Sequence, residues 1–158
     1  MSQPSDSNSD DCTQDDLSPD SNFHQLVYTL SHANENKLSG AQLNAVAPVS
    51  LAYIGDAVFE MYVRSRLLFP AKRIRDYHTQ VVSQVKAEQQ ADYADLLLPY
   101  LNDIEKDILR RGRNATTGRQ RRAAAQSYQK ATGFEALIGF LYLSNQPRLF
   151  DLLERLSV

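Results

Sequence analysis

The chain has 158 residues, 42% of them apolar, and a formal net charge of −2, which suits one domain with a sizeable core and is too short for two ordinary ones. No apolar run approaches the roughly 20 residues that a membrane span needs, and the N-terminus lacks the basic start and apolar centre of a signal peptide, so we expect a cytoplasmic protein without a membrane partner. The single cysteine, Cys12, and the scattered histidines His24, His32 and His78 argue against an intramolecular disulfide, a zinc site and thiol catalysis.

The first 22 residues differ in composition from the rest of the chain. They hold six aspartates and no lysine or arginine, together with many serines and asparagines and almost no large apolar side chain. Such a segment cannot bury enough surface to order itself, so we predict a disordered acidic tail over residues 1–22 and a single helical domain over residues 23–158. Outside the tail, 17 basic side chains stand against 13 acidic ones, and this net charge of +4 is compatible with an anionic partner.

Three helices are predicted in the first half of this domain. Residues 23–31 have apolar positions at helical spacing, and a short helix is predicted over 39–47, where Pro48 stops it. A long apolar helix is predicted next over residues 49–68, and it ends before Phe69-Pro70 because a residue that precedes proline disfavours helical geometry.

The second half of the chain has the same helical character. Residues 71–93 predict one amphipathic helix with a basic solvent face, and residues 103–111 predict a short helix with acids in its first turn and arginines in its last, as the helix dipole favours. Residues 122–144 predict another apolar helix, and Pro147 opens a terminal one. No segment has the pattern of a strand, so we predict an all-α fold.

An aspartate, Asp56, interrupts the apolar pattern of the helix predicted over residues 49–68. The apolar positions recur at helical intervals, at Leu51, Ile54 or Gly55, Val58, and Met61 or Tyr62. Asp56 lies at the edge of this stripe, on one line with Ala52, Glu60 and Arg64. An ionised carboxylate in such a place needs a partner. A capping position, an arginine from another helix and a metal ion are all compatible with the residues.

Glu135 occupies a similar place in the apolar helix predicted over residues 122–144. It is the only acid in the stretch from Ala131 to Leu143. Two apolar helices that each carry one acid can face each other, and their carboxylates can then share a cation such as Mg²⁺, which prefers hard oxygen ligands.

Between residues 110 and 122 the chain is strongly basic. This run contains two glycines and no acid, and its candidate phosphate-binding residues are Arg110, Arg111, Arg113, Asn114, Arg119, Arg121 and Arg122. Arginine forks and free backbone donors in a glycine-containing loop suit phosphate oxygens. The alternative is a solvent-exposed linker.

Two short motifs resemble a known family. Tyr53-Ile54-Gly55-Asp56-Ala57-Val58 resembles the signature helix of the ribonuclease III family, and Phe134-Glu135-Ala136-Leu137-Ile138-Gly139 resembles its second acidic motif. The joint match is closest to the short bacterial branch called Mini-ribonuclease III, which consists of the nuclease domain alone, and it covers about residues 40–156.

This resemblance implies a ribonuclease III-type helical endonuclease domain in which Asp56 and Glu135 are the catalytic residues and the ligands of Mg²⁺, with Mn²⁺ as a substitute. It also implies a homodimer that hydrolyses both strands of double-stranded RNA. The substrate that it implies is a precursor of large-subunit ribosomal RNA.

The sequence departs from full-length ribonuclease III at two positions. That enzyme has further carboxylates one turn before the signature aspartate and three residues before the second-motif glutamate, where this chain has Ala52 and Thr132. The reduced acidic set is similar to that of the Mini-ribonuclease III branch. It also supports an alternative, a non-catalytic helical module that binds duplex RNA through its arginine run. A helical scaffold dimer without nucleic acid is a third interpretation.

Overall fold

A computed structural model describes Gln25 and residues 40–115 and 122–158 of the chain, with side chains from residue 125 onward in the last range. The predicted acidic tail over residues 1–22 lies outside the described residues, and so does the helix predicted over 23–31, except that Gln25 is helical and exposed. The fold described below is therefore that of residues 40–115 and 122–158.

The described part of the chain contains helices and no strand, which confirms the predicted all-α fold. None of its helices is long and apolar enough to cross a membrane. The helices are α2 (Gly40–Ala45), α3 (Pro48–Leu67), α4 (Ile74–Val85), α5 (Ala87–Leu97), the short 3₁₀ helix η1 (Leu98–Tyr100), α6 (Asp103–Asn114), α7 (Arg122–Ser144) and α8 (Gln146–Leu153).

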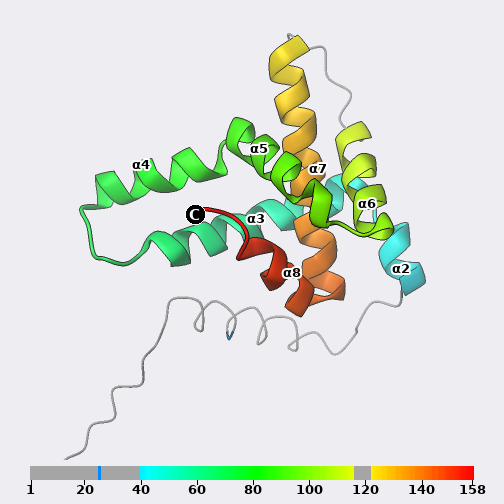
Figure 1. Cartoon of the computed structure of the whole chain (residues 1–158), viewed down its shortest axis with the longest axis horizontal. Helices are drawn as coiled ribbons and strands as arrows, with labels where there is room; N and C mark the ends of the chain where they lie inside the picture. Colours follow the sequence, from blue (N-terminus) through cyan, green and yellow to red (C-terminus); the bar gives the residue numbers. More distant parts are fainter. Residues whose placement is uncertain (1–24, 26–39, 116–121) are drawn as a thin grey trace, which may run out of the picture.

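Helix α7 is the centre of the fold, and α3, α5, α6 and α8 pack around it (Figure 1). Its side chains Phe134, Leu137 and Ile138 are completely buried. Phe134 meets Phe59 of α3 edge to face, with ring centroids 4.9 Å apart, a favoured aromatic geometry. This core holds α3 and α7 together over their middle turns.

The buried face of α3 is rotated from the predicted stripe. Phe59 and Val63 are fully buried, whereas Met61 is 45% exposed. The prediction treated Met61 and Tyr62 as equivalent, and the structure buries Tyr62, whose hydroxyl donates a hydrogen bond to the carbonyl oxygen of Leu153 at 3.2 Å. The contact with α7 and this bond to the end of α8 therefore cover the Tyr62 side of α3.

The single helix predicted over residues 71–93 is wrong, because the chain breaks at Lys86. The backbone of Lys86 is extended, with φ −67° and ψ 151°, and it separates α4 from α5. Helix α4 packs against α3, where the Tyr77 hydroxyl donates to the carbonyl oxygen of Arg64 at 2.7 Å. Helix α5 instead buries Tyr93 and Leu97 against the core. One straight helix cannot make both contacts.

Helix α6 begins at a capping box, in which the Asn102 side chain accepts from the backbone N–H of Glu105 and the Glu105 carboxylate accepts from the backbone N–H of Asn102. Glu105 is only 2% exposed and also accepts two hydrogen bonds from Arg148, at 2.9 and 3.1 Å. Burial opposes the charge on Glu105, but the bonds from Arg148 and from the Asn102 backbone outweigh it and lower the pKa of this carboxyl. This buried ion pair ties α6 to α8.

Candidate functional site

Helices α3 and α7 touch backbone to backbone through two glycines. A Cβ atom placed on Gly55 would lie 1.8 Å from the carbonyl oxygen of Glu135, and one placed on Gly139 would lie 2.0 Å from the carbonyl oxygen of Leu51. No side chain fits between the helices at either position. The two glycines therefore set the distance between the helix turns that carry the two predicted catalytic acids.

The predicted catalytic residues, Asp56 and Glu135, are brought together by this contact. Burial, and after it the negative charge of Asp56, raises the pKa of Glu135 to about 7. Burial and the charge of Glu60 raise the pKa of Asp56 as well. The negative charge of Asp56 thus adds to the burial that disfavours ionisation of Glu135.

Among the described residues, no basic side chain neutralises either acid. In the described part of the chain, no ion pair joins Asp56 or Glu135 to lysine or arginine, whereas Glu60 is paired with Arg64 at 2.5 Å. Asp56 lies in the middle of α3, so it is not a helix cap either. The arginine partner and the capping role that the sequence left open for Asp56 are both absent from the described structure.

The donor set fits a hard divalent cation. A cation held by the two carboxylates would offset the cost of burying their charges, which raises both pKa values, and the repulsion that Asp56 adds at Glu135. Mg²⁺ needs only one or two carboxylates because it keeps several waters. No group of three or more His, Cys, Asp or Glu side chains suited to a metal occurs among the described residues. The site therefore offers a carboxylate pair rather than a closed cage.

The two positions that lack an acid are part of the protein interior. Ala52 is 4% exposed and packs with Leu43 and Ala136 in a small second core. Thr132 is 6% exposed, and its hydroxyl donates to the carbonyl oxygen of Tyr128 at 3.0 Å. Neither residue has a free polar group to offer the carboxylate pair.

The predicted phosphate-binding loop starts later than the sequence indicated. Arg110, Arg111, Arg113 and Asn114 belong to α6, whose helical hydrogen bonds use most of the backbone donors expected to be free. Gly112 is a packing residue, since a Cβ atom there would lie 2.6 Å from that of Ala136.

The structure does not describe the side chains of the other predicted phosphate ligands. Arg119 and Arg121 lie outside the described residues, and Arg122 is the first residue of α7, with its side chain outside the description. On α6, Arg110 forms an exposed ion pair with Asp107 at 2.5 Å. Such a surface pair is worth at most about 1 kcal/mol, so Arg110 can exchange it for a phosphate.

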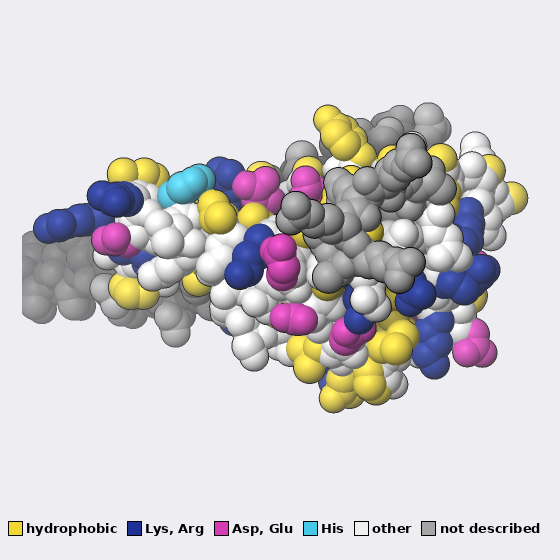
Figure 2. Space-filling view, turned by 90° about the horizontal axis from the view of Figure 1, so that it is seen from above, with side chains coloured by type: hydrophobic (Ala, Val, Ile, Leu, Met, Phe, Trp, Pro, Cys, Tyr) yellow, Lys and Arg dark blue, Asp and Glu magenta, His cyan; other side chains and the backbone are white. Residues whose placement is uncertain are grey.

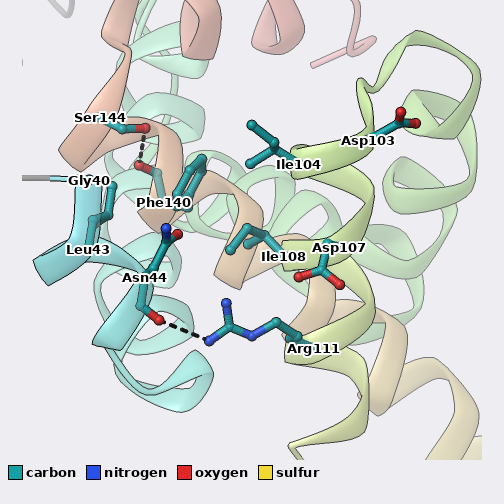
Figure 3. A pocket seen from close by; sticks show the side chains of 10 residues that line it. All are labelled: Gly40, Leu43, Asn44, Asp103, Ile104, Asp107, Ile108, Arg111, Phe140 and Ser144. Atoms are coloured by element: carbon teal, nitrogen blue, oxygen red, sulfur yellow. Dashed lines mark hydrogen bonds between the residues drawn. The ribbon is translucent and has the colours of Figure 1, made fainter.

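Arg111 has a structural contact. It crosses from α6 to α2 and donates a hydrogen bond to the carbonyl oxygen of Asn44 at 3.3 Å (Figure 3). It lines an open pocket of about 590 Å³ between α2, α6 and α7, with Leu43, Ile108 and Phe140 as apolar walls. Asp56 and Glu135 do not line this pocket, so it is separate from the carboxylate pair.

Charge is unevenly distributed over the surface. On the face shown in Figure 2, lysine and arginine side chains gather at the two ends of the molecule, with acidic side chains between them. One basic end is the arm of α3 and α4, and the other lies near α6.

One neighbour of the carboxylate pair was not found from the sequence. Gln90 of α5 is 1% exposed, lies beside the Glu135 carboxyl group and acts to lower its pKa. Its amide nitrogen Nε2 nevertheless has no hydrogen-bond partner of regular geometry. In the sequence Gln90 follows Glu88 and Gln89 in a polar run, and nothing local distinguishes it from an exposed residue.

The helical fold belongs to a nuclease domain. The sequence pattern of the ribonuclease III domain matches residues 49–146, and the chain belongs to the ribonuclease III family. It is therefore an endoribonuclease, a phosphodiester hydrolase of the ribonuclease III type.

Its relatives lie in the Mini-ribonuclease 3 branch of that family. The chain is 50% identical over 126 residues to the Mini-ribonuclease 3 of a Synechocystis species, which covers 80% of this chain and 88% of the relative. It is 49% identical over 110 residues to that of Thermosynechococcus vestitus, with 70% and 73% covered. A crystal structure of a Fusobacterium nucleatum protein shares the fold, with a TM-score of 0.64 and 25% identity over 70% of this chain and 90% of that one.

Proposed function

We propose that this endoribonuclease hydrolyses double-stranded RNA in a magnesium-dependent reaction, with Asp56 and Glu135 as its catalytic, metal-binding pair and Mn²⁺ able to replace Mg²⁺. The observation that carries the proposal is the uncompensated carboxylate pair where α3 and α7 touch, in a chain of the ribonuclease III family. Both acids come from the motifs that resemble the family's acidic motifs.

The two carboxylates differ in protonation and in exposure. Glu135 must lose its proton to act as a ligand, and its pKa of about 7 places that loss near neutral pH. Asp56 is more exposed and is the natural side for a phosphate to approach. The carboxylates of Asp56 and Glu135 would hold Mg²⁺, which would supply an activated water and positive charge to offset that of the phosphate.

RNA binding is assigned to the exposed arginines of α6 and to the basic residues that follow it. Arg110, Arg113 and the start of α7 at Arg122 supply cationic contacts to phosphates, while Arg111 supports α2. Duplex RNA is the substrate class because its A-form backbone offers a fixed spacing of phosphates that a rigid protein can bind without reading bases. A precursor of large-subunit ribosomal RNA is the substrate that the resemblance implies.

We also infer that the active form is a homodimer. Val49, Tyr53, Ala57 and Met61 follow one another at four-residue intervals on α3, and all four are exposed, with Tyr53 86% exposed. An apolar stripe beside the catalytic turn suits a second copy related by a twofold axis. Light scattering should give about twice the chain mass of 17.8 kDa, and Tyr53→Arg should reduce it to the monomer value.

The test of the function is cleavage of long double-stranded RNA by purified protein with millimolar Mg²⁺ or with excess chelator, beside single-stranded RNA of the same sequence. Asp56→Asn should abolish cleavage while the protein stays folded, because the amide keeps the shape of the side chain and loses its charge. Near wild-type cleavage by this variant would remove Asp56 from the site.

The same assay decides between the enzyme and the non-catalytic module. A protein that binds duplex RNA but does not cut it at any Mg²⁺ or Mn²⁺ concentration would support the module, and it would trace the loss of activity to Ala52 and Thr132. Calcium should support binding better than cutting. The expected cytoplasmic location stays a prediction.

A further inference from the structure

Gln90 is an anomaly in the packing of the described residues. It is 1% exposed, and its Nε2 is the buried side-chain polar atom of the described part that has no hydrogen bond of regular geometry, although the amide lies close enough to Glu135 to lower the pKa of that carboxyl. The other buried polar side chains there, Glu105 and Thr132, are hydrogen-bonded. An unsatisfied buried amide donor costs about 1–3 kcal/mol, and methionine or leucine would fill the same space without that cost.

The Gln90 amide lies beside the Glu135 carboxyl group. Helix α5 packs on α7 next to the catalytic turn, and an ion pair between Lys130 and Asp95 at 2.5 Å joins the same two helices. Asp56 belongs to α3 and Gln90 to α5, and both helices pack on α7, which carries Glu135 (Figure 1). Both residues act on the pKa of Glu135.

A primary amide is suited to this place because it is neutral. It can donate a hydrogen bond to one oxygen of an ionised carboxylate and stabilise the charged form. A lysine or arginine in the same place would neutralise the carboxylate and compete with the cation. The amide therefore orients the carboxylate and leaves its charge for the metal.

We propose that Gln90 is a positioning residue whose Nε2 donates to the Glu135 carboxylate when the metal is bound and holds it toward Asp56. The inference rests on the proposed function, since it assumes that Glu135 is a metal ligand. The Nε2 donor is then already in place in the metal-free protein, and it forms its hydrogen bond to Glu135 when the metal binds. Partners of metal ligands of this kind are typically worth 10- to 100-fold in metal affinity or activity.

Gln90→Met tests this directly, because methionine is of similar size and has no N–H in its side chain. Its thermal stability should equal or exceed that of the wild type, since the unsatisfied donor is gone. Its affinity for Mn²⁺, measured without RNA by electron paramagnetic resonance, should fall at least 10-fold, and its cleavage should need correspondingly more Mg²⁺. Gln89→Met, on the same helix and one residue earlier, is the matched control and should keep wild-type affinity.

A second measurement does not depend on the folding of a variant. In wild-type protein, the side-chain amide resonances of Gln90 should move when Mg²⁺ is added, while those of Gln89 should stay in place. If Gln90→Met binds Mn²⁺ as the wild type does, or the Gln90 resonances do not move at saturation, the positioning role is overturned and the metal site stands. If the wild type neither binds Mn²⁺ nor cuts duplex RNA, the proposed function itself fails.

Discussion

Replacing Gly55 by alanine should separate α3 and α7, the helices that carry the two proposed catalytic acids. The new Cβ atom would lie 1.8 Å from the carbonyl oxygen of Glu135, whereas ordinary van der Waals contact begins at 3.4 Å, so α3 and α7 must move apart by more than an ångström. The clashing atom belongs to the backbone of the central helix and cannot rotate away. Overpacking typically costs about 1–3 kcal/mol, and this site should lie at the upper end, near 3 kcal/mol.

That cost can be measured in two ways. For a chain of this length, about 3 kcal/mol corresponds to a fall in Tm of roughly 6–12 °C, measured by circular dichroism. Well below Tm, the initial rate of cleavage of duplex RNA should fall about 100-fold, because a displacement of about 1 Å in a catalytic constellation has an effect of that size.

Gly40→Ala is the matched control for this substitution. A Cβ atom on Gly40 meets nothing within 4 Å, so Tm and rate should change little. A Gly55→Ala protein with wild-type Tm and wild-type rate would refute the argument that the glycine contact sets the spacing of the acids.

Three further changes test the charges of the protein. The pKa of Glu135 in the folded state, about 7, lies above its ordinary value of 4.5, so the folded protein binds one more proton than the unfolded protein between these two pH values. The free energy of unfolding, measured by urea titration, should therefore fall by about 2 kcal/mol from pH 4 to pH 8, and Glu135→Gln should not show this loss. The rate of cleavage should rise as the pH passes 7, because Glu135 then loses its proton. Arg148→Met leaves Glu105 buried without its cation and should cost about 3–5 kcal/mol in thermal unfolding, with a negligible loss contradicting the role of this pair. Arg113→Ala should weaken binding to unrelated duplexes alike and reduce the slope of log affinity against log salt by about one, whereas Arg155→Ala, just after the end of α8, should not. Equal slopes for both variants would contradict a phosphate contact by Arg113.

The local sequence was sufficient for the helices with strong periodic patterns. The limits of α3 and α7 were predicted within one residue because proline or a change of composition marks their ends and apolar residues recur throughout. The start of α6 is also fixed by neighbouring residues, since Asn102 and Glu105 form a capping box across the first turn. The two acids stood out for the same reason, as lone charges in apolar helices.

An all-α chain, two helices that each present one carboxylate, and the motifs of the ribonuclease III family could all be read from local residues. How these parts meet depends on packing between segments that are distant in the chain. The break at Lys86 has no glycine or proline to announce it, because it arises from two helices packing in different directions. Gln90 became a buried neighbour of Glu135 for the same reason, since burial depends on which face of α5 the central helix covers. The close contact through Gly55 is likewise a property of two surfaces far apart in the chain, which local residue patterns do not encode.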